Sequence, residues 1–339
     1  MLPNCRKMKS ATLVCFLLML APVSHADISK RKDVNAFIDR MVKEHNFKRE
    51  DLVKTFKKVK INPKIIEAIT RPAEAKPWHE YRPIFLTDER IRQGVQFWRK
   101  YANTLQRAYE TYGVAPEIIV AIIGVETKYG KHKGKFPVMN ALSTLAFEYP
   151  KRASFFEKEL EEFLLLAREE KVNPMKIKGS YAGAMGKPQF IASSYRRYAV
   201  DFNGDGKRDI LNSTVDAIGS VANYFAEHNW YKDEPITSLA TVTGDKHKEL
   251  VEKGIKPSMP LSEVIEAGVS IDDKHSSNLD TALIEYELKD GKEYWVAFNN
   301  FYVITRYNHS ELYGMAAYQL AQEIKRFRFV GPRKRPNKK

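Results

Sequence analysis

Apolar residues recur at three- and four-residue spacings along most of the chain, which is the period of an amphipathic helix. In the first third this pattern predicts helices in VNAFIDRMVKEH, LVKTFKKV, PKIIEAI and ERIRQGVQFWRKYANTLQRAYETYG (residues 34–45, 52–59, 63–69 and 89–113). The intervening stretch RPAEAKPWHEYRPIF (71–85) is rich in proline and aromatic residues. We expect it to be irregular and to end in extended structure.

The pattern changes after residue 230. Residues 113–230 are again helical in period, although glycine-rich loops interrupt them, whereas SLATVT, ALIEYEL and EYWVAF (238–243, 282–288 and 293–298) have the composition of strands. KDGK (289–292) joins the last two and predicts a hairpin. SELYGMAAYQLAQEIKRF (310–327) predicts a final helix. The expected fold class is mainly α, of the α+β type, with a small β-rich part before the last helix.

The first 26 residues have a different pattern. MLPNCRKMKS has three basic and no acidic residues, ATLVCFLLML is an apolar run, and APVSHA ends in small residues. This is typical of a secretory signal peptide cleaved after Ala26, and a buried N-terminal helix is the alternative. Both cysteines lie in this segment, and Cys15 follows Val14 within the apolar run. A lipoprotein anchor is therefore not expected, and the predicted location is the bacterial periplasm.

Composition and charge narrow the class of partner. The 339 residues are 43% hydrophobic and 29% charged, as in an ordinary globular protein, with 56 basic and 42 acidic residues. This excess of basic residues favours contact with anionic polymers or surfaces, such as wall glycan or membrane head groups. The basic tail (331–339) could make such contacts or remain solvated. No nucleic-acid-binding motif is present, so no nucleic acid partner is expected, and we expect a monomer.

The stretch AIIGVETKYG (121–130) places Glu126 at the end of an apolar helical run that starts at Pro116. Isoleucines three, four and seven residues earlier would share its helix face. Burial on that face would raise the pKa of Glu126 and keep it protonated, as a general acid requires. The alternative is a structural acid turned to solvent and paired with Lys128 or Lys131.

Two further stretches suggest a ligand-binding cleft. KGSYAGAMGKPQF (178–190) combines small residues, which allow close approach of the backbone, with Tyr181, Met185 and Gln189. FYVITRYNHS (301–310) is an alternating apolar run that leads into Tyr307 and Asn308, a ring and an amide suited to binding sugar. A helix-packing loop and an edge strand, respectively, are the alternatives.

DFNGDGKRDI (201–210) has the spacing of a calcium-binding loop. Asp201, Asn203 and Asp205 occupy positions 1, 3 and 5, Gly206 occupies position 6, and Asp209 occupies position 9. Position 12 is an asparagine in place of the usual glutamate, and Asp216 could supply the missing carboxylate from a longer loop. A metal-free turn is the alternative. The sequence contains no phosphate-binding loop, HExxH or GxSxG motif, and no organic cofactor is expected.

Taken in order, these stretches resemble the lytic murein transglycosylase B family. The resemblance rests on IIVAIIGVETKYG, ALSTLAFEYPKRASFF, KGSYAGAMGKPQF, SSYRRYAVDFNGDG, DAIGSVANYF and NFYVITRYN and spans roughly residues 75 to 320. It implies a lysozyme-like catalytic core at 113–230, a helical domain at 27–112 completed by 301–330, and a small β-rich domain at 231–300. The implied substrate is the glycan strand of peptidoglycan.

The resemblance also assigns roles to residues. It implies that Glu126 is the single catalytic acid. The residues implied to line the glycan cleft are Tyr81, Ser180, Gln189, Tyr224, Tyr307 and Asn308. The implied ligands of a structural Ca²⁺ are Asp201, Asn203, Asp205, the Lys207 carbonyl and Asp216. Lys187-Pro188 departs from the smaller pair that relatives can carry.

One acid predicts a lytic transglycosylase, which cleaves the bond between N-acetylmuramic acid and N-acetylglucosamine without water and leaves 1,6-anhydro ends. Hydrolysis ordinarily needs a second carboxylate. Two alternatives therefore stay open. One is a hydrolytic muramidase that uses a second acid such as Glu148 or Asp209, and the other is a peptidoglycan-binding protein without activity.

Overall fold

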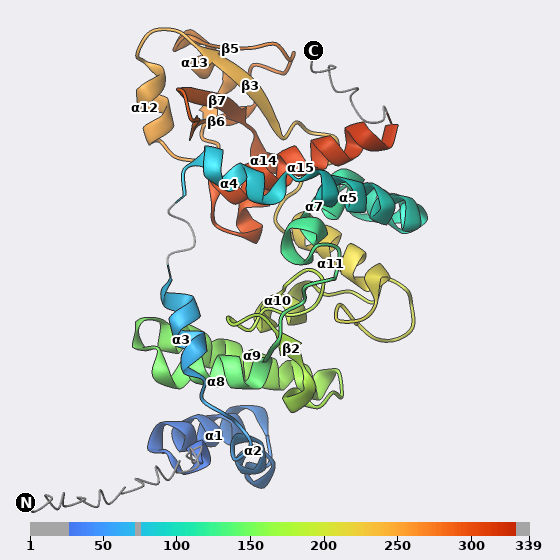
Figure 1. Ribbon diagram of the computed structural model, residues 1–339, viewed down its shortest axis with the longest axis vertical. Helices are drawn as coiled ribbons and strands as arrows, with labels where there is room; N and C mark the ends of the chain where they lie inside the picture. The colour runs from blue at the N-terminus through green and yellow to red at the C-terminus, as the bar shows by residue number, and fades with distance from the viewer. Residues whose placement is uncertain (1–26, 72–75, 330–339) are drawn as a thin grey trace, which may run out of the picture.

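The computed structural model describes residues 27–71 and 76–329. The signal peptide and the basic tail predicted from sequence lie outside these residues. The described part is mostly helical, and Figure 1 shows an elongated molecule with α1 and α2 at one end and the β-rich part at the other. The helices are α1 (Lys32–His45), α2 (Arg49–Phe56), α3 (Pro63–Thr70), α4 (Trp78–Phe85), α5 (Asp88–Lys100), α6 (Ala102–Tyr112), α7 (Pro116–Thr127), α8 (Val138–Glu148), α9 (Ala153–Glu169), α10 (Ala192–Tyr198), α11 (Thr214–Glu227), α12 (His247–Glu252), α13 (Leu261–Glu266), α14 (Asn299–Tyr307) and α15 (Glu311–Phe329).

The N-terminal helices fall into two groups in space. α3 packs against α8 at the lower end of the molecule, whereas α4 and α5 pack against α15 near the β-rich part (Figure 1). The predicted long helix over 89–113 is in fact two helices, since α5 packs on α15 whereas α6 packs on α11. Tyr101 separates them with φ −114° and ψ 27°, outside the helical region. The domain boundaries expected from the sequence stay a prediction.

The prediction that residues 71–85 end in extended structure is wrong. Residues 78–85 form α4, whose buried Trp78 and Tyr81 pack in a cluster with Tyr286 and Phe301. Residues 301–305 belong to α14, which buries Phe301, Val303 and Ile304 together, so the edge strand that the sequence left open as an alternative is not formed.

The β-rich part is one five-stranded antiparallel sheet in the order β4-β6-β7-β3-β5. The hairpin predicted at KDGK is confirmed, since it joins β6 and β7, with Glu287 opposite Lys292. β1 and β2 form a separate antiparallel pair, which joins the segment that follows α7 to the segment before Ser180. The strands are β1 (Phe136–Pro137), β2 (Lys178–Gly179), β3 (Thr237–Val242), β4 (Met259–Pro260), β5 (Val269–Ile271), β6 (Asp280–Glu287) and β7 (Lys292–Ala297).

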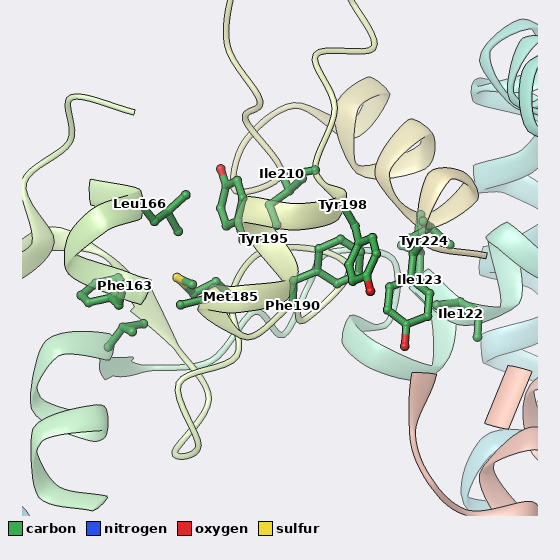
Figure 2. Packing of buried hydrophobic residues seen from close by; sticks show 14 of the residues in the cluster. Ile122, Ile123, Phe163, Leu166, Met185, Phe190, Tyr195, Tyr198, Ile210 and Tyr224 are labelled. Atoms are coloured by element: carbon green, nitrogen blue, oxygen red, sulfur yellow. The ribbon is translucent and has the colours of Figure 1, made fainter. Parts of the chain in front are cut away.

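The largest hydrophobic cluster surrounds α7, whose apolar residues from Ile118 to Ile123 are fully buried. Figure 2 shows Ile122 and Ile123 beside Tyr224, with Phe190 and Tyr198 next to them. No single helix in the described residues is long and apolar enough to span a membrane. The α6–α7 pair meets the length and composition test only together, with a bend of 114°. The apolar part of the helix that carries Glu126 is enclosed by other parts of the fold.

Candidate active site

Glu126 lies in the last turn of α7, at the end of the buried apolar run. Pro116 begins the helix, and the backbone turns left-handed at Lys128 and Tyr129 immediately after it ends. Burial raises the pKa of Glu126 to about 7, because desolvation penalises the ionised carboxylate. Among the described residues Glu126 has no ion pair, so the alternative pairing with Lys128 or Lys131 is absent from this structure.

Tyr313 is the direct partner of Glu126. Its hydroxyl donates a hydrogen bond to Glu126 Oε1 at 2.6 Å, from α15 across the junction with α7. This bond favours the carboxylate and lowers the pKa of Glu126, partly opposing desolvation. Burial raises the pKa of Tyr313 well above its ordinary value, and the charge of Glu126 adds to that rise. The phenol therefore remains a proton donor in this bond.

Tyr129 fixes the helix end behind the acid. Its hydroxyl donates to the Arg90 carbonyl at 2.8 Å, and the ring fills the space over Gly124. A Cβ at Gly124 would come within 2.6 Å of that hydroxyl, so glycine is needed for the close approach. Thr127 adds a second link, because its hydroxyl donates to the Lys187 carbonyl at 3.0 Å. The end of α7 that carries Glu126 is thus tied to α5 and to the 186–189 loop.

Aromatic residues surround the Glu126–Tyr313 pair. The Tyr307 ring lies parallel to that of Tyr313, with centroids 6.4 Å apart, and its hydroxyl donates to the Pro188 carbonyl at 2.6 Å. Tyr224 packs on Tyr307 and donates its hydroxyl to the Arg306 carbonyl. These hydroxyls are used to join elements, which leaves the rings as the surfaces that can contact a sugar.

The other predicted cleft residues take different positions. Tyr81 is buried; its ring is stacked on that of Trp78 and packs at a tilt against that of Phe85. Asn308 is exposed at the end of α14.

Ser180 and Gln189 belong to the loop that packs against the end of α7. The Ser180 hydroxyl accepts hydrogen bonds from the amides of Ala182 and Ala184, at 3.2 and 3.0 Å. Gln189 has φ 51°, and its side-chain amide donates to the Gly186 carbonyl at 2.9 Å and to the Lys133 carbonyl at 3.4 Å. Ser180 can still donate its hydroxyl proton, and Gln189 Oε1 has no partner among the described residues.

Neither alternative second acid points to Glu126. Glu148 forms an ion pair with Arg31, which joins α8 to the start of α1. Asp209 Oδ1 accepts the backbone amides of Leu211 and Asn212, at 3.1 and 2.9 Å. Within the part of the chain that the structure describes, the contacts of both carboxylates serve local structure.

The 201–209 loop has the turn expected of the calcium pattern. Asp201 accepts the amides of Gly204 and Gly206, at 2.8 and 2.7 Å, and both glycines have positive φ. Asp216 is fully buried and accepts backbone amides of the same loop, including that of Phe202 at 3.0 Å. Burial raises its pKa, although these amides oppose the rise. The described residues contain no group of three or more His, Cys, Asp or Glu placed to hold a metal ion.

Sequence reasoning did not identify Tyr313, Tyr129 or Thr127. Tyr313 lies in SELYGMAAYQL, where it is one bulky polar ring among small residues. That contrast is the only local sign that Tyr313 has a special role. It gives no information about a partner 187 residues away in the chain.

Comparisons with known proteins assign this geometry to a family. The family model for the Transglycosylase SLT domain matches residues 29–322. Membrane-bound lytic murein transglycosylase B of Escherichia coli is 41% identical over 308 residues, which cover 88% of this chain and 84% of that protein.

Solved structures agree. Lytic transglycosylase SltB1 of Pseudomonas aeruginosa has 50% identity and a TM-score of 0.85, covering 89% of this chain and 100% of that one. The Escherichia coli enzyme Slt35 in complex with calcium has 40% identity and a TM-score of 0.82, covering 89% and 95%. SltB3 of Pseudomonas aeruginosa in complex with NAG-anhNAM-pentapeptide has 31% identity and a TM-score of 0.77, covering 86% and 78%. The chain therefore belongs to the transglycosylase SLT-domain family and is a lytic murein transglycosylase of the MltB and SltB type, an enzyme with a lysozyme-like fold that acts on peptidoglycan.

Proposed function

We propose that this enzyme cleaves the β-1,4 bond between N-acetylmuramic acid and N-acetylglucosamine without water, with Glu126 as acid and then as base. The observation that carries the proposal is the position of Glu126. It ends a buried helix, its pKa is raised to about 7, and a phenol donates to it. A large fraction of such a carboxyl is protonated at neutral pH, as the first step requires.

In the first step the protonated Glu126 donates its proton to the glycosidic oxygen, and the bond from C1 to that oxygen breaks. The N-acetylglucosamine side leaves as an alcohol, and positive charge develops at C1 of the muramic acid, which the neighbouring acetamido group can stabilise. Glu126 is now a carboxylate. The Tyr313 hydroxyl, 2.6 Å from Oε1, stabilises this negative charge.

In the second step the Glu126 carboxylate takes the proton of the C6 hydroxyl, and the C6 oxygen bonds to C1. The product is a 1,6-anhydromuramic end, and Glu126 is again protonated. Atoms balance without water, so no second carboxylate is needed to activate one. The contacts of Glu148 with Arg31 and of Asp209 with backbone amides support this assignment over hydrolysis.

The glycan is expected to lie over the aromatic surfaces beside Glu126. The half-buried Tyr307 ring would contact a sugar face, and the buried rings of Tyr81 and Tyr224 would back the cleft and exclude water. The free proton of Ser180 and Oε1 of Gln189 can bind N-acetyl groups, and Asn308 offers an exposed amide. The complexes of related enzymes with NAG-anhNAM-pentapeptide and with the inhibitor bulgecin A support a glycan-strand substrate.

The 201–216 segment suits Ca²⁺ by the chemistry of its donors, which are all oxygen atoms. Asp201, Asn203, Asp205, the Lys207 carbonyl and Asp216 would hold the ion, and Asp216 is a buried carboxylate without an ion pair among the described residues. The calcium complex of Slt35 supports the same identity. The role we propose for the ion is structural, since the loop precedes α11, which carries Tyr224.

The place of action is the periplasmic cell wall, which agrees with the murein substrate of the relatives. Export through a signal peptide over residues 1–26, cleaved after Ala26, is part of the proposal. So is a monomeric state, with the basic surface contacting wall or membrane anions.

The test is the chemistry of the glycan ends. Purified wall digested by the enzyme should yield anhydromuramic ends, one water lighter than reducing ends in mass spectrometry, and Glu126→Gln should produce neither. Reducing ends would instead show hydrolysis. Undiminished cleavage by Glu126→Gln would show that another residue is the acid.

A further inference from the structure

A hollow of about 600 Å³ lies beside the loop that carries Gln189 and is not used by the mechanism above. Four segments meet there: residues 133–134 after α7, residues 172–178 after α9, Gly186, and residues 211–212 before α11. Lys133, Lys176 and Lys178 line it, and none of its described lining residues is acidic.

A fourth lysine lies next to the hollow and is buried. Lys187 is 9% exposed, and its Nζ donates to the Asn212 carbonyl at 2.8 Å. Lys133 Nζ donates to the preceding carbonyl, that of Leu211, also at 2.8 Å. Burial, followed by the nearby charge of Lys133, lowers the pKa of Lys187 to about 8. Two ammonium groups are thus held close together by neutral carbonyls.

The acidic residues nearest to Lys187 do not neutralise the four lysines in and beneath the hollow. Asp209 and Asp216 lie close enough to raise the pKa of Lys187, against the larger effect of burial. Their oxygens, however, accept backbone amides, and neither forms an ion pair among the described residues. Lys176 and Lys178 are exposed and likewise have no ion pair in the described ranges. An anion entering the hollow would therefore meet converging positive charge that the fold leaves uncompensated.

The hollow shares its wall with the glycan-binding loop. The Gln189 side chain donates to the carbonyls of Lys133 and Gly186, and both residues line the hollow. A ligand in the hollow would therefore lie close to Gln189, which is proposed to contact the sugar. The anions attached to this substrate are the carboxylates of its peptide stems.

We propose that the hollow formed by Lys133, Lys176 and Lys178, with Lys187 beneath it, binds a carboxylate of a peptidoglycan peptide stem. The proposal rests on the proposed function in one respect, since it takes peptidoglycan as the substrate. It gives the enzyme a preference for glycan that still carries stems.

The experiment compares a disaccharide muropeptide with the same disaccharide lacking its peptide, by calorimetric titration of the full-length protein. Lys176→Gln/Lys178→Gln removes two exposed charges without touching the bonds of Lys133 or Lys187. Lys54→Gln/Lys58→Gln, two exposed lysines at the α2 end, is the matched control. The first pair should weaken binding of the stem-bearing ligand by roughly tenfold, equivalent to about 1.4 kcal/mol, and should leave binding of the stem-free ligand unchanged.

Three results would overturn the inference. They are equal binding of both ligands by the unmodified protein, an equal loss in the control pair, and inorganic phosphate binding to the hollow where the stem does not. Formation of anhydro ends is read separately on stem-free glycan chains. A negative binding result for the hollow therefore leaves the proposed reaction untouched. A failure to form anhydro ends on stem-free glycan would count against the reaction and not against the hollow.

Discussion

Replacing Tyr313 by phenylalanine tests how the acidity of Glu126 is set. The change deletes the 2.6 Å hydrogen bond to Oε1 and keeps the buried ring in place. Hydrogen bonds to charged groups contribute about 1.5–3 kcal/mol, and one pKa unit corresponds to about 1.4 kcal/mol. Because the bond favours the carboxylate, its loss should raise the pKa of Glu126 from about 7 by about 1–2 units.

The assay is the pH dependence of kcat/KM for release of soluble muropeptides. In the proposed mechanism the reaction requires protonated Glu126, so activity should fall as pH rises through this pKa. In Tyr313→Phe the alkaline limb should move to higher pH, while the maximal rate should drop because the carboxylate formed in the first step loses a donor.

Tyr318→Phe is the matched control for this change. Tyr318 lies on the same helix, and its hydroxyl donates to the Thr237 carbonyl at 3.4 Å, away from Glu126. Its profile should match that of the unmodified enzyme. An alkaline limb that stays in place in Tyr313→Phe, or moves to lower pH, would refute the reasoning.

Three further predictions concern stability. Folding raises the pKa of Glu126 from 4.5 to about 7, so ionisation of Glu126 does not destabilise the protein below pH 4.5 and destabilises it progressively up to pH 7. Glu126→Gln should therefore stabilise the protein by up to about 3 kcal/mol at pH 8 and much less at pH 4.5. An equal gain at both pH values in urea denaturation would count against this. Calcium should raise the melting temperature and a chelator should lower it, with both effects lost in Asp201→Asn; a melting temperature indifferent to calcium would argue against the site. Gly124→Ala should destabilise by about 1–3 kcal/mol and reduce kcat, because its Cβ would meet Tyr129 Oη at 2.6 Å; an unchanged unfolding midpoint would contradict the close packing.

The sequence was informative where a single segment determines its own environment. The unbroken apolar run after Pro116 can only be a buried helix at this length, and so the unusual position of Glu126 could be predicted. The KDGK hairpin is equally local, since its turn fixes the pairing of β6 with β7. Membership of the family could also be inferred from motifs in order, and the comparisons confirm it.

The prediction for residues 78–85 failed because tertiary packing outweighed local preference. Pro83 argued against a helix at 78–85, yet it lies near the end of the short α4, where few backbone bonds depend on it. Burial of Trp78 and Tyr81 against the β6 and α14 side chains then favours the helix. Packing also decides between the readings left open for the FYVIT run, which belongs to α14 and contacts both α15 and β7.

The site itself was predictable only in part. Glu126 follows from one helix, but its pKa depends on Tyr313, which approaches from α15. Tyr224 and Tyr307 could be named as ring surfaces, whereas the use of their hydroxyls to join α11, α14 and the 186–189 loop depends on the folded arrangement.

The most direct test of the account is the mass of the glycan ends made by the enzyme from purified peptidoglycan. Transfer to the C6 hydroxyl by Glu126 alone predicts anhydromuramic ends, one water lighter than reducing ends, and no incorporation of ¹⁸O when the digest is run in labelled water. Reducing ends carrying ¹⁸O would contradict it, because they would require a water molecule and a second group to activate it.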